Sequence, residues 1–182
     1  MNRLRDNRCY LAGPMEHAPD GGASWRKYVQ TSLCSLGIVW LDPTNKPIQI
    51  GREDRGFNDY LRALKEVGAW SKIAREVKLI RSVDLRMVDI ADFLIVHLNL
   101  DIQTCGTWEE LFWANRMKKP CLVHIAQGKD RCPSWLFGVL PHQMIFSNWE
   151  ELFCSVRHVA QDSDALVDDL NRWRFFELSR TA

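Results

Sequence analysis

The chain has 182 residues, of which 46% are hydrophobic and 26% charged, and its formal net charge is +1. This balance is typical of one ordinary globular domain with a sizeable core. A nearly neutral chain has no strong field for nucleic acid polymers or membrane surfaces, so a small-molecule ligand is the better expectation. No stretch approaches the ~20 apolar residues of a membrane span and no secretory signal is evident, which predicts a cytoplasmic location.

Six cysteines and five histidines are scattered along the sequence. None of the cysteines forms a CxxC pair, and none lies at zinc-ligand spacing from a histidine. We therefore expect reduced thiols in a reducing compartment, no metal and no other cofactor.

Short apolar runs alternate with helical periodicity. The expected strands are residues 9–12, 38–41, 91–98, 121–125 and 143–146. The expected helices are residues 24–36, 57–67, 70–88, 107–117, 134–137, 148–160 and 163–177, with a break at Gly68. This alternation predicts a single α/β domain over residues 1–182: a Rossmann- or flavodoxin-like parallel five-stranded sheet, with helices on both faces and a helical tail over 147–182.

Ligands of such sheets bind beyond the carboxyl ends of the strands, which directs attention to loops 13–24, 42–56 and 99–110. In the first loop, glycines at 13, 21 and 22 would let backbone amides face a phosphate or a sugar. Ser24 is expected to cap the helix that follows, and Arg26 could add a positive charge. The loop has neither Walker nor GxGxxG spacing, so a plain surface loop is the alternative.

The third loop leads into a helix that we expect to begin at Thr107. Gly106 would permit a close approach of backbone and ligand, and Glu109 and Glu110 would fall in the first helical turn. The competing interpretation is structural, because Thr107 and Glu110 have the spacing of a capping box. Residues 147–150 (SNWE) repeat that spacing without obvious chemistry.

Two aspartates flank the third expected strand. Asp84 lies on the preceding helix, either on a solvated face or in a pocket. Asp92 falls at the amino end of the strand, where a structural role is expected. The chain has eight tryptophans, and Trp25, Trp40 and Trp108 are the candidates to stack on a base. Core packing is expected for most tryptophans and is the favoured role of Trp40.

The strings CYLAGPM, LDPT, VDLRMVDIADFLIVHLN and GTWEELFWANRMKKPCLV occur in this order within residues 8–126. Together they resemble the nucleoside 2-deoxyribosyltransferase family, which includes related hydrolases of nucleoside 5′-monophosphates. The resemblance implies that Glu110 is the nucleophile, with Glu109 as the fallback, Asp84 as the partner carboxylate and Tyr10 as a residue that orients the nucleophile. The substrate-binding positions expected with them are Gly13, Pro14, Gly22, Trp25, Arg26, Asp42, Asp101, Gly106, Thr107 and Glu109.

One position departs from the family pattern. Transferases of the family often carry an aspartate six residues before the nucleophile, and this chain has Thr104 there, with Asp101 as the nearest acid. The contacts to the sugar, and therefore the choice between ribose and deoxyribose, stay open.

The implied reaction cleaves the N-glycosidic bond of a (deoxy)nucleoside or its 5′-monophosphate through a glycosyl-glutamate intermediate. Asp84, if protonated, would assist departure of the base. Transfer to a second base would make the protein a transferase, and transfer to water would make it a 5′-monophosphate N-glycosidase. A non-catalytic nucleotide sensor is the alternative of another class. The resemblance also implies a homo-oligomer, a dimer or higher, in which the aromatic segment LNRWRFFEL would pack on a neighbouring subunit.

Overall fold

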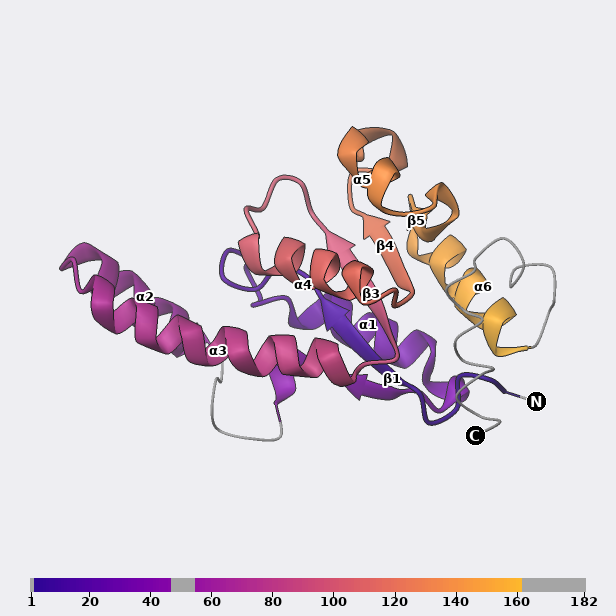
Figure 1. Cartoon of the computed structure of the whole chain (residues 1–182), viewed down its shortest axis with the longest axis horizontal. Coiled ribbons are helices and arrows are strands. Elements are labelled where there is room, and N and C mark those ends of the chain that lie inside the picture. The colour runs from indigo at the N-terminus through magenta and orange to yellow at the C-terminus, as the bar shows by residue number, and fades with distance from the viewer. Residues whose placement is uncertain (1, 47–54, 162–182) are drawn as a thin grey trace.

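The computed structural model describes residues 2–46 and 55–161. The strands are β1 (Arg8–Ala12), β2 (Val39–Leu41), β3 (Phe93–Leu98), β4 (Cys121–Ile125) and β5 (Ile145–Phe146). The α-helices are α1 (Ala23–Ser32), α2 (Arg55–Glu66), α3 (Trp70–Ile90), α4 (Cys105–Arg116), α5 (Ser134–Val139) and α6 (Trp149–Ala160). Together they form the α/β arrangement drawn in Figure 1.

The five strands form one parallel sheet in the order β2-β1-β3-β4-β5. From β1, the chain first adds β2 on one side and then crosses back to add β3 on the other. The strand order therefore reverses between β1 and β3, and such a switch point opens a crevice at the carboxyl ends of the two strands. This is where the fold would receive a ligand.

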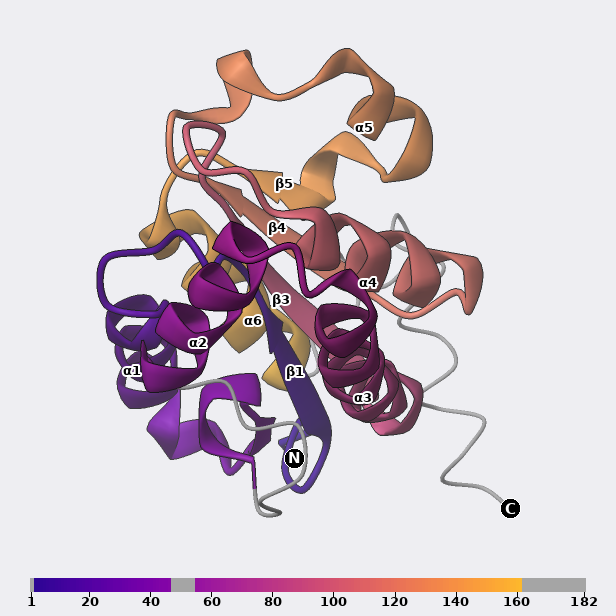
Figure 2. The same cartoon turned by 90° about the vertical axis from the view of Figure 1, so that its left-hand side faces the viewer.

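Helices cover both faces of the sheet, with α1 and α6 on one side and α3 and α4 on the other (Figure 2). Successive side chains of a strand point to opposite faces. In β1, Cys9 and Leu11 therefore pack in the core beneath α1 and α6, whereas Tyr10 and Ala12 pack in the core beneath α3 and α4. This alternation directs the Tyr10 side chain toward α4.

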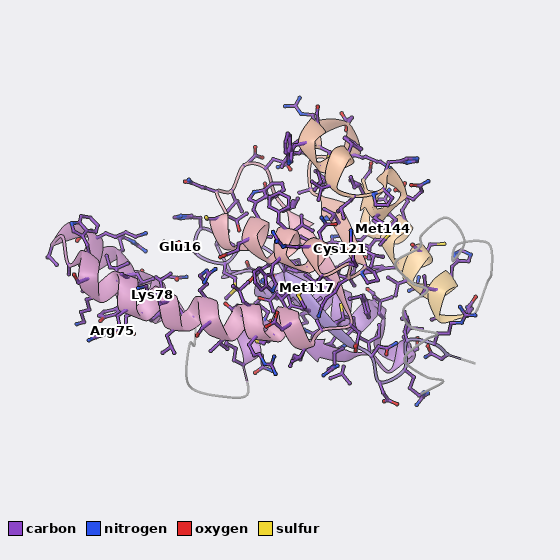
Figure 3. The ribbon with its side chains drawn as sticks, in the orientation of Figure 1. Glu16, Arg75, Lys78, Met117, Cys121 and Met144 are labelled. Atoms are coloured by element: carbon purple, nitrogen blue, oxygen red, sulfur yellow. The ribbon has the colours of Figure 1, made fainter. Side chains whose placement is uncertain are left out.

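The helices α2 and α3 form an antiparallel pair whose outer end extends past the sheet (Figure 1). Gly68 ends α2 with a positive φ of 67°, a conformation that glycine adopts without strain. Arg75 and Lys78 project from the outer part of α3, away from the sheet (Figure 3). The inner part of α3 packs against α4.

The expected fold class is confirmed, including the parallel five-stranded sheet, the helices on both faces and the break at Gly68. The first helix ends four residues earlier than expected, at Ser32, and a separate 3-10 turn covers Cys34–Leu36. The expected helix at 163–177 and the aromatic segment LNRWRFFEL lie outside the described residues.

The expected cap of α1 was wrong. Gly22 occupies the N-cap position, and the Asp20 carboxylate accepts hydrogen bonds from the backbone N–H groups of Gly22 (2.9 Å) and Ser24 (2.7 Å). Hydrogen bonding from Ser24 lowers the pKa of Asp20 to about 2. Asp20, two residues before the N-cap, therefore binds the backbone that the Ser24 side chain was expected to cap.

Candidate active site

A tyrosine and a glutamate meet at the carboxyl edge of the sheet. The Tyr10 hydroxyl donates a 2.7 Å hydrogen bond to Oε1 of Glu110. The pKa of Tyr10 lies well above its ordinary value, first because the phenol is buried and then because Glu110 and Asp84 are negatively charged. The phenol therefore stays protonated and remains a donor. This hydrogen bond holds Glu110 in place through one of its two carboxylate oxygens.

A second carboxylate reaches the same region from α3. Asp84 is only 8% exposed, which excludes the solvated helix face. Its Oδ1 lies 2.7 Å from Nζ of Lys46, whose side chain is 1% exposed. Lys46 follows the 3-10 turn η2 (Pro43–Asn45) after β2, so the ion pair joins the second strand-end loop to α3. The site thus contains a buried carboxylate with a buried counterion.

Both carboxylates line a cavity of about 340 Å³ at this edge of the sheet. Of the expected site residues, the cavity is lined by Gly13, Arg26, Asp84, Gly106, Thr107, Glu109 and Glu110. Such a volume lies in the range of small-molecule sites. The expected nucleophile, its partner carboxylate and the glycine-containing loops are therefore brought together.

The start of α4 differs from the expectation. The helix begins at Cys105 with Thr104 as its N-cap, two residues earlier than expected, and no acidic residue lies in its first turn. The capping-box interpretation of Thr107 and Glu110 was therefore wrong. Thr107 instead lies 3% exposed with its hydroxyl against that of Thr104, and Glu110 is hydrogen bonded to Tyr10.

The second segment with capping-box spacing, Ser147 to Glu150, was also misassigned, because the cap lies one position later. Asn148 is the N-cap of α6, and its side-chain oxygen accepts a 2.9 Å hydrogen bond from the Glu151 N–H. The Asn148 amide donates in return to the Glu151 carboxylate at 2.9 Å. The reciprocal cap therefore uses Asn148 and Glu151.

Glu109 faces a different partner from Glu110. Arg81 of α3 donates to both of its oxygens, with Nε 2.8 Å from Oε2. This hydrogen bonding is the main reason why the pKa of Glu109 is lowered. Both side chains are partly exposed and line the cavity, so they link α3 to α4 at its border. Glu109 is thus held by Arg81, whereas Glu110 is bound to the buried phenol of Tyr10.

Arg26 is buried and bound to the protein's own backbone. Its guanidinium donates to the carbonyl oxygens of Leu11 (3.2 Å), Gly22 (2.9 Å) and Gly13 (3.0 Å). Gly22 has a φ of +79°, and an added Cβ would lie 2.3 Å from the Arg26 guanidinium. These contacts fix the path of the loop between β1 and α1, so Arg26 shapes the wall of the cavity.

Several expected binding residues do not line the cavity: Pro14, Gly22, Trp25, Asp42 and Asp101. Asp42 caps the turn η2 by accepting from the Thr44 N–H at 2.8 Å, and Asp101 accepts from Gln127 at 2.8 Å. Trp25 stacks on Trp149 on the opposite face of the sheet. Trp40 and Trp108 also pack against the two cores, so none of the three tryptophans lines the cavity.

Sequence reasoning missed the wall of the cavity that the helical pair supplies. It consists of Phe57, Asn58 and Leu61 of α2 and of Val77, Ile80, Arg81 and Leu85 of α3, beside the expected Asp84. Glu16, labelled in Figure 3, lines the same cavity, and its carboxylate accepts from Lys65 of α2 at 2.8 Å. Periodicity predicted both helices, but it carries no information on where a helical pair docks.

Asp92 has the structural role expected for it. Its carboxylate accepts from the Arg8 N–H at 2.7 Å, at the amino end of the sheet. Within residues 2–46 and 55–161, no group of three or more His, Cys, Asp or Glu side chains is arranged to hold a metal ion. No helix in those ranges is both long and apolar enough to cross a membrane.

No protein-family profile matches the sequence, and no curated protein matches it. Among solved structures, the chain is similar to 2-deoxyribosyltransferase from Bacillus psychrosaccharolyticus, with 15% identity over 80% of this chain and 90% of that chain, and a TM-score of 0.54. The 2-desoxiribosyltransferase from Leishmania mexicana shows 21% identity over 66% of this chain and 65% of that chain, just under two thirds of its length, with a TM-score of 0.44. A CMP N-glycosidase from Clostridium botulinum shows 14% identity over 83% and 98%, with a TM-score of 0.45. The likeness to the Bacillus enzyme confirms the fold that the resemblance implied.

Proposed function

We propose that the protein cleaves the N-glycosidic bond of a (deoxy)nucleoside or its 5′-monophosphate and transfers the sugar to another base. The observation that carries this proposal is the 2.7 Å hydrogen bond from Tyr10 to Glu110, which itself lines the cavity. It distinguishes Glu110 from Glu109, which is bound to Arg81. The fold shared with a bacterial 2-deoxyribosyltransferase supports the same chemistry.

In the first step, Glu110 attacks C1′ of the sugar. The C1′–N bond breaks, its electron pair goes to the departing base, and a bond forms between a Glu110 oxygen and C1′. The transition state has oxocarbenium character, which a nearby carboxylate stabilises. Tyr10 orients the attacking group, because its hydroxyl holds one carboxylate oxygen.

In the second step, an acceptor attacks C1′ and releases Glu110. If the acceptor is the nitrogen of a second base, the product is a new nucleoside, and if it is water, the product is the free sugar or sugar phosphate. The Arg81–Glu109 and Lys65–Glu16 pairs bring side chains from four separate segments to the cavity border, which supports transfer. Exclusion of water favours capture of the intermediate by a bound base.

A base-release assay tests the proposal. Purified protein is incubated with each deoxynucleoside, ribonucleoside and 5′-monophosphate, with and without a second free base, and the products are separated by chromatography. The matched variants are Glu110→Ala and Glu109→Ala, which remove adjacent carboxylates from the same helix. We expect a new nucleoside only when a second base is present, and loss of that product in Glu110→Ala alone.

Other results have definite meanings. Release of base in water, lost in Glu110→Ala, would replace transfer by hydrolysis as the function. Tight binding of one nucleotide without turnover would contradict enzymatic activity and favour a nucleotide sensor. The expected homo-oligomer stays a prediction, which light scattering of the purified full chain would test.

A further inference from the structure

The ion pair between Lys46 and Asp84 joins two buried, opposite charges beside the cavity. The Lys46 Nζ atom lies 2.7 Å from Asp84 Oδ1, and the two side chains are 1% and 11% exposed. Burial of a lone charge is costly, so each group depends on the other to remain charged in this position. Lys46 is not among the residues that line the cavity, whereas Asp84 is. Any effect of Lys46 on a ligand must therefore act through Asp84.

The other charges around Asp84 strengthen its dependence on Lys46. Among the described residues, the titratable or charged side chains that face this region are Tyr10 of β1, Glu16 before α1, Arg26 of α1, Lys46 after η2, Arg81 of α3, and Glu109 and Glu110 of α4. Arg81 is bound to Glu109 and Arg26 to three backbone carbonyls. Glu110 is a second carboxylate close by, and two neighbouring carboxylates oppose each other's ionisation. Among residues 2–46 and 55–161, Lys46 is the cation found in contact with Asp84.

We propose that Lys46 is a positioning residue that acts through Asp84, fixing its orientation and holding it ionised so that it accepts a hydrogen bond from the ligand. This inference rests on the proposed function and changes one part of it. An ionised Asp84 has no proton to donate to the leaving base. The electron pair of the broken C1′–N bond then stays on the base nitrogen, and the base takes its proton from water.

The two roles of Asp84 predict opposite responses to pH. A protonated donor would lose activity as the pH rises and the carboxyl group loses its proton. An ionised acceptor loses activity as the pH falls. An opposite charge in contact shifts the titration of a carboxyl group by roughly one to three units. Removing Lys46 should therefore move the acidic fall in kcat to higher pH by at least about one unit.

The experiment compares wild type with Lys46→Met, Lys46→Arg, Asp84→Asn and the double variant Lys46→Met/Asp84→Asn. Arg62→Met is the matched control, because Arg62 forms an exposed ion pair with Asp59 on α2. We expect the acidic fall to shift in Lys46→Met, to stay in place in Lys46→Arg and Arg62→Met, and to be identical in Asp84→Asn and the double variant. If Lys46→Met does not fold, the double variant removes both charges, and Lys46→Arg against wild type supplies the pH comparison.

Infrared difference spectra supply a readout that does not need activity. The spectrum of wild type minus Asp84→Asn at neutral pH should contain carboxylate bands. As the pH is lowered, the protonated carboxyl band should appear at higher pH in Lys46→Met minus the double variant than in wild type minus Asp84→Asn. A protonated carboxyl band from wild-type Asp84 at neutral pH, or an unshifted pH profile in Lys46→Met, would overturn the proposal. Carboxylate bands without turnover of any nucleoside or nucleotide would overturn the proposed function instead, and leave the charge state of Asp84 as inferred.

Discussion

The hydroxyl of Tyr10, the third residue of strand β1, is bonded to Glu110 of α4, 100 residues further along the chain, at 2.7 Å. The fold places these two residues together because Tyr10 points to the face that α4 covers. The contact joins the sheet to the carboxylate that we assign as nucleophile.

Tyr10→Phe should lower kcat by about 10- to 100-fold, because a hydrogen bond to a charged group contributes about 1.5–3 kcal/mol. The ring stays in the core, so the change removes only the donor. Steady-state kinetics with the best substrate of the base-release assay would measure the effect. Tyr28→Phe is the control, since Tyr28 is exposed and lies on the other side of the sheet. Equal kcat values for Tyr10→Phe and wild type would show that the phenol does not orient the reacting carboxylate.

Gly106→Ala should separate stability from binding. A Cβ at Gly106 meets no atom within 4 Å and would enter the cavity. Alanine is the better helix former, so the free energy of unfolding should stay equal or rise by up to about 1 kcal/mol. Binding should nevertheless weaken by about tenfold or more, the usual effect of a misplaced methyl group in a fitted site. Calorimetric titration and urea unfolding measure the two quantities.

The control is Gly138→Ala in α5, where an added Cβ also meets nothing within 4 Å but lies away from the cavity. It should share the effect on stability and leave binding unchanged. Unaltered affinity in Gly106→Ala would mean that the ligand does not lie against the first turn of α4.

Cys105 should report on occupancy of the site. It is an exposed free thiol that lines the cavity, whereas Cys34 and Cys154 are exposed elsewhere. In a Cys34→Ser/Cys154→Ser background, N-ethylmaleimide should attach to Cys105 and abolish turnover, because the adduct fills the cavity. A saturating nucleoside should slow the labelling, as followed by mass spectrometry. Adding Cys105→Ser to that background should make turnover insensitive to the reagent, and full activity of the labelled protein would contradict the location of the site.

The two histidines His97 and His124 should make the protein sensitive to acid. Their Nδ1 atoms are 2.9 Å apart, and His124 stacks on Trp149. Burial lowers the pKa of both to about 4, and the charge of His124 and of Arg26 contributes further for His97. Between about pH 6.5 and 4 the unfolded chain binds protons that the folded chain does not. Stability should therefore be complete above pH 6.5 and fall as the pH drops toward 4.

Urea unfolding at pH 7, 6, 5 and 4.5 measures this loss. The double variant His97→Phe/His124→Phe should flatten the decline in that range, whereas His158→Gln, on the exposed side of α6, should not. Asp20, with a pKa of about 2, contributes a loss only below its unfolded value near 3.8, so the two windows are separate. An unchanged decline in the double variant would assign the acid sensitivity to other groups.

The five parallel strands could be predicted from the sequence because each is a short, continuous apolar run. Residues 121–125 form β4 with the expected bounds, and the break at Gly68 lies between α2 and α3. The start of α4 was harder, because Thr104 and Thr107 are both acceptable caps and lie three residues apart. The structure has Thr104 as the N-cap, and Glu110 is bonded to Tyr10 instead of closing a capping box with Thr107. This tertiary contact cannot be predicted from the spacing of the two threonines.

The carboxylates of the site could be predicted, and the surrounding wall could not. Glu110 and Asp84 stand in strings that resemble a known family, but the residues Phe57, Leu61 and Val77 carry no motif. The position of Trp25 was misjudged for a related reason: its neighbour in the chain, Arg26, lines the cavity, while the indole points to the core under α6. Adjacent residues at a helix start face different sides, and sequence spacing alone does not say which faces the ligand.

The outer wall of the cavity belongs to a helical pair that reaches past the sheet, and the reacting pair Tyr10 and Glu110 belongs to the sheet and to α4. Under the proposed function, exchanges at Phe57, Leu61 or Val77 should change which bases fit, while Tyr10 and Glu110 stay in place. Asp84 is the exception, because it stands on α3 in the same wall as these side chains. Base preference and bond breaking would then respond to substitutions in largely separate parts of the chain.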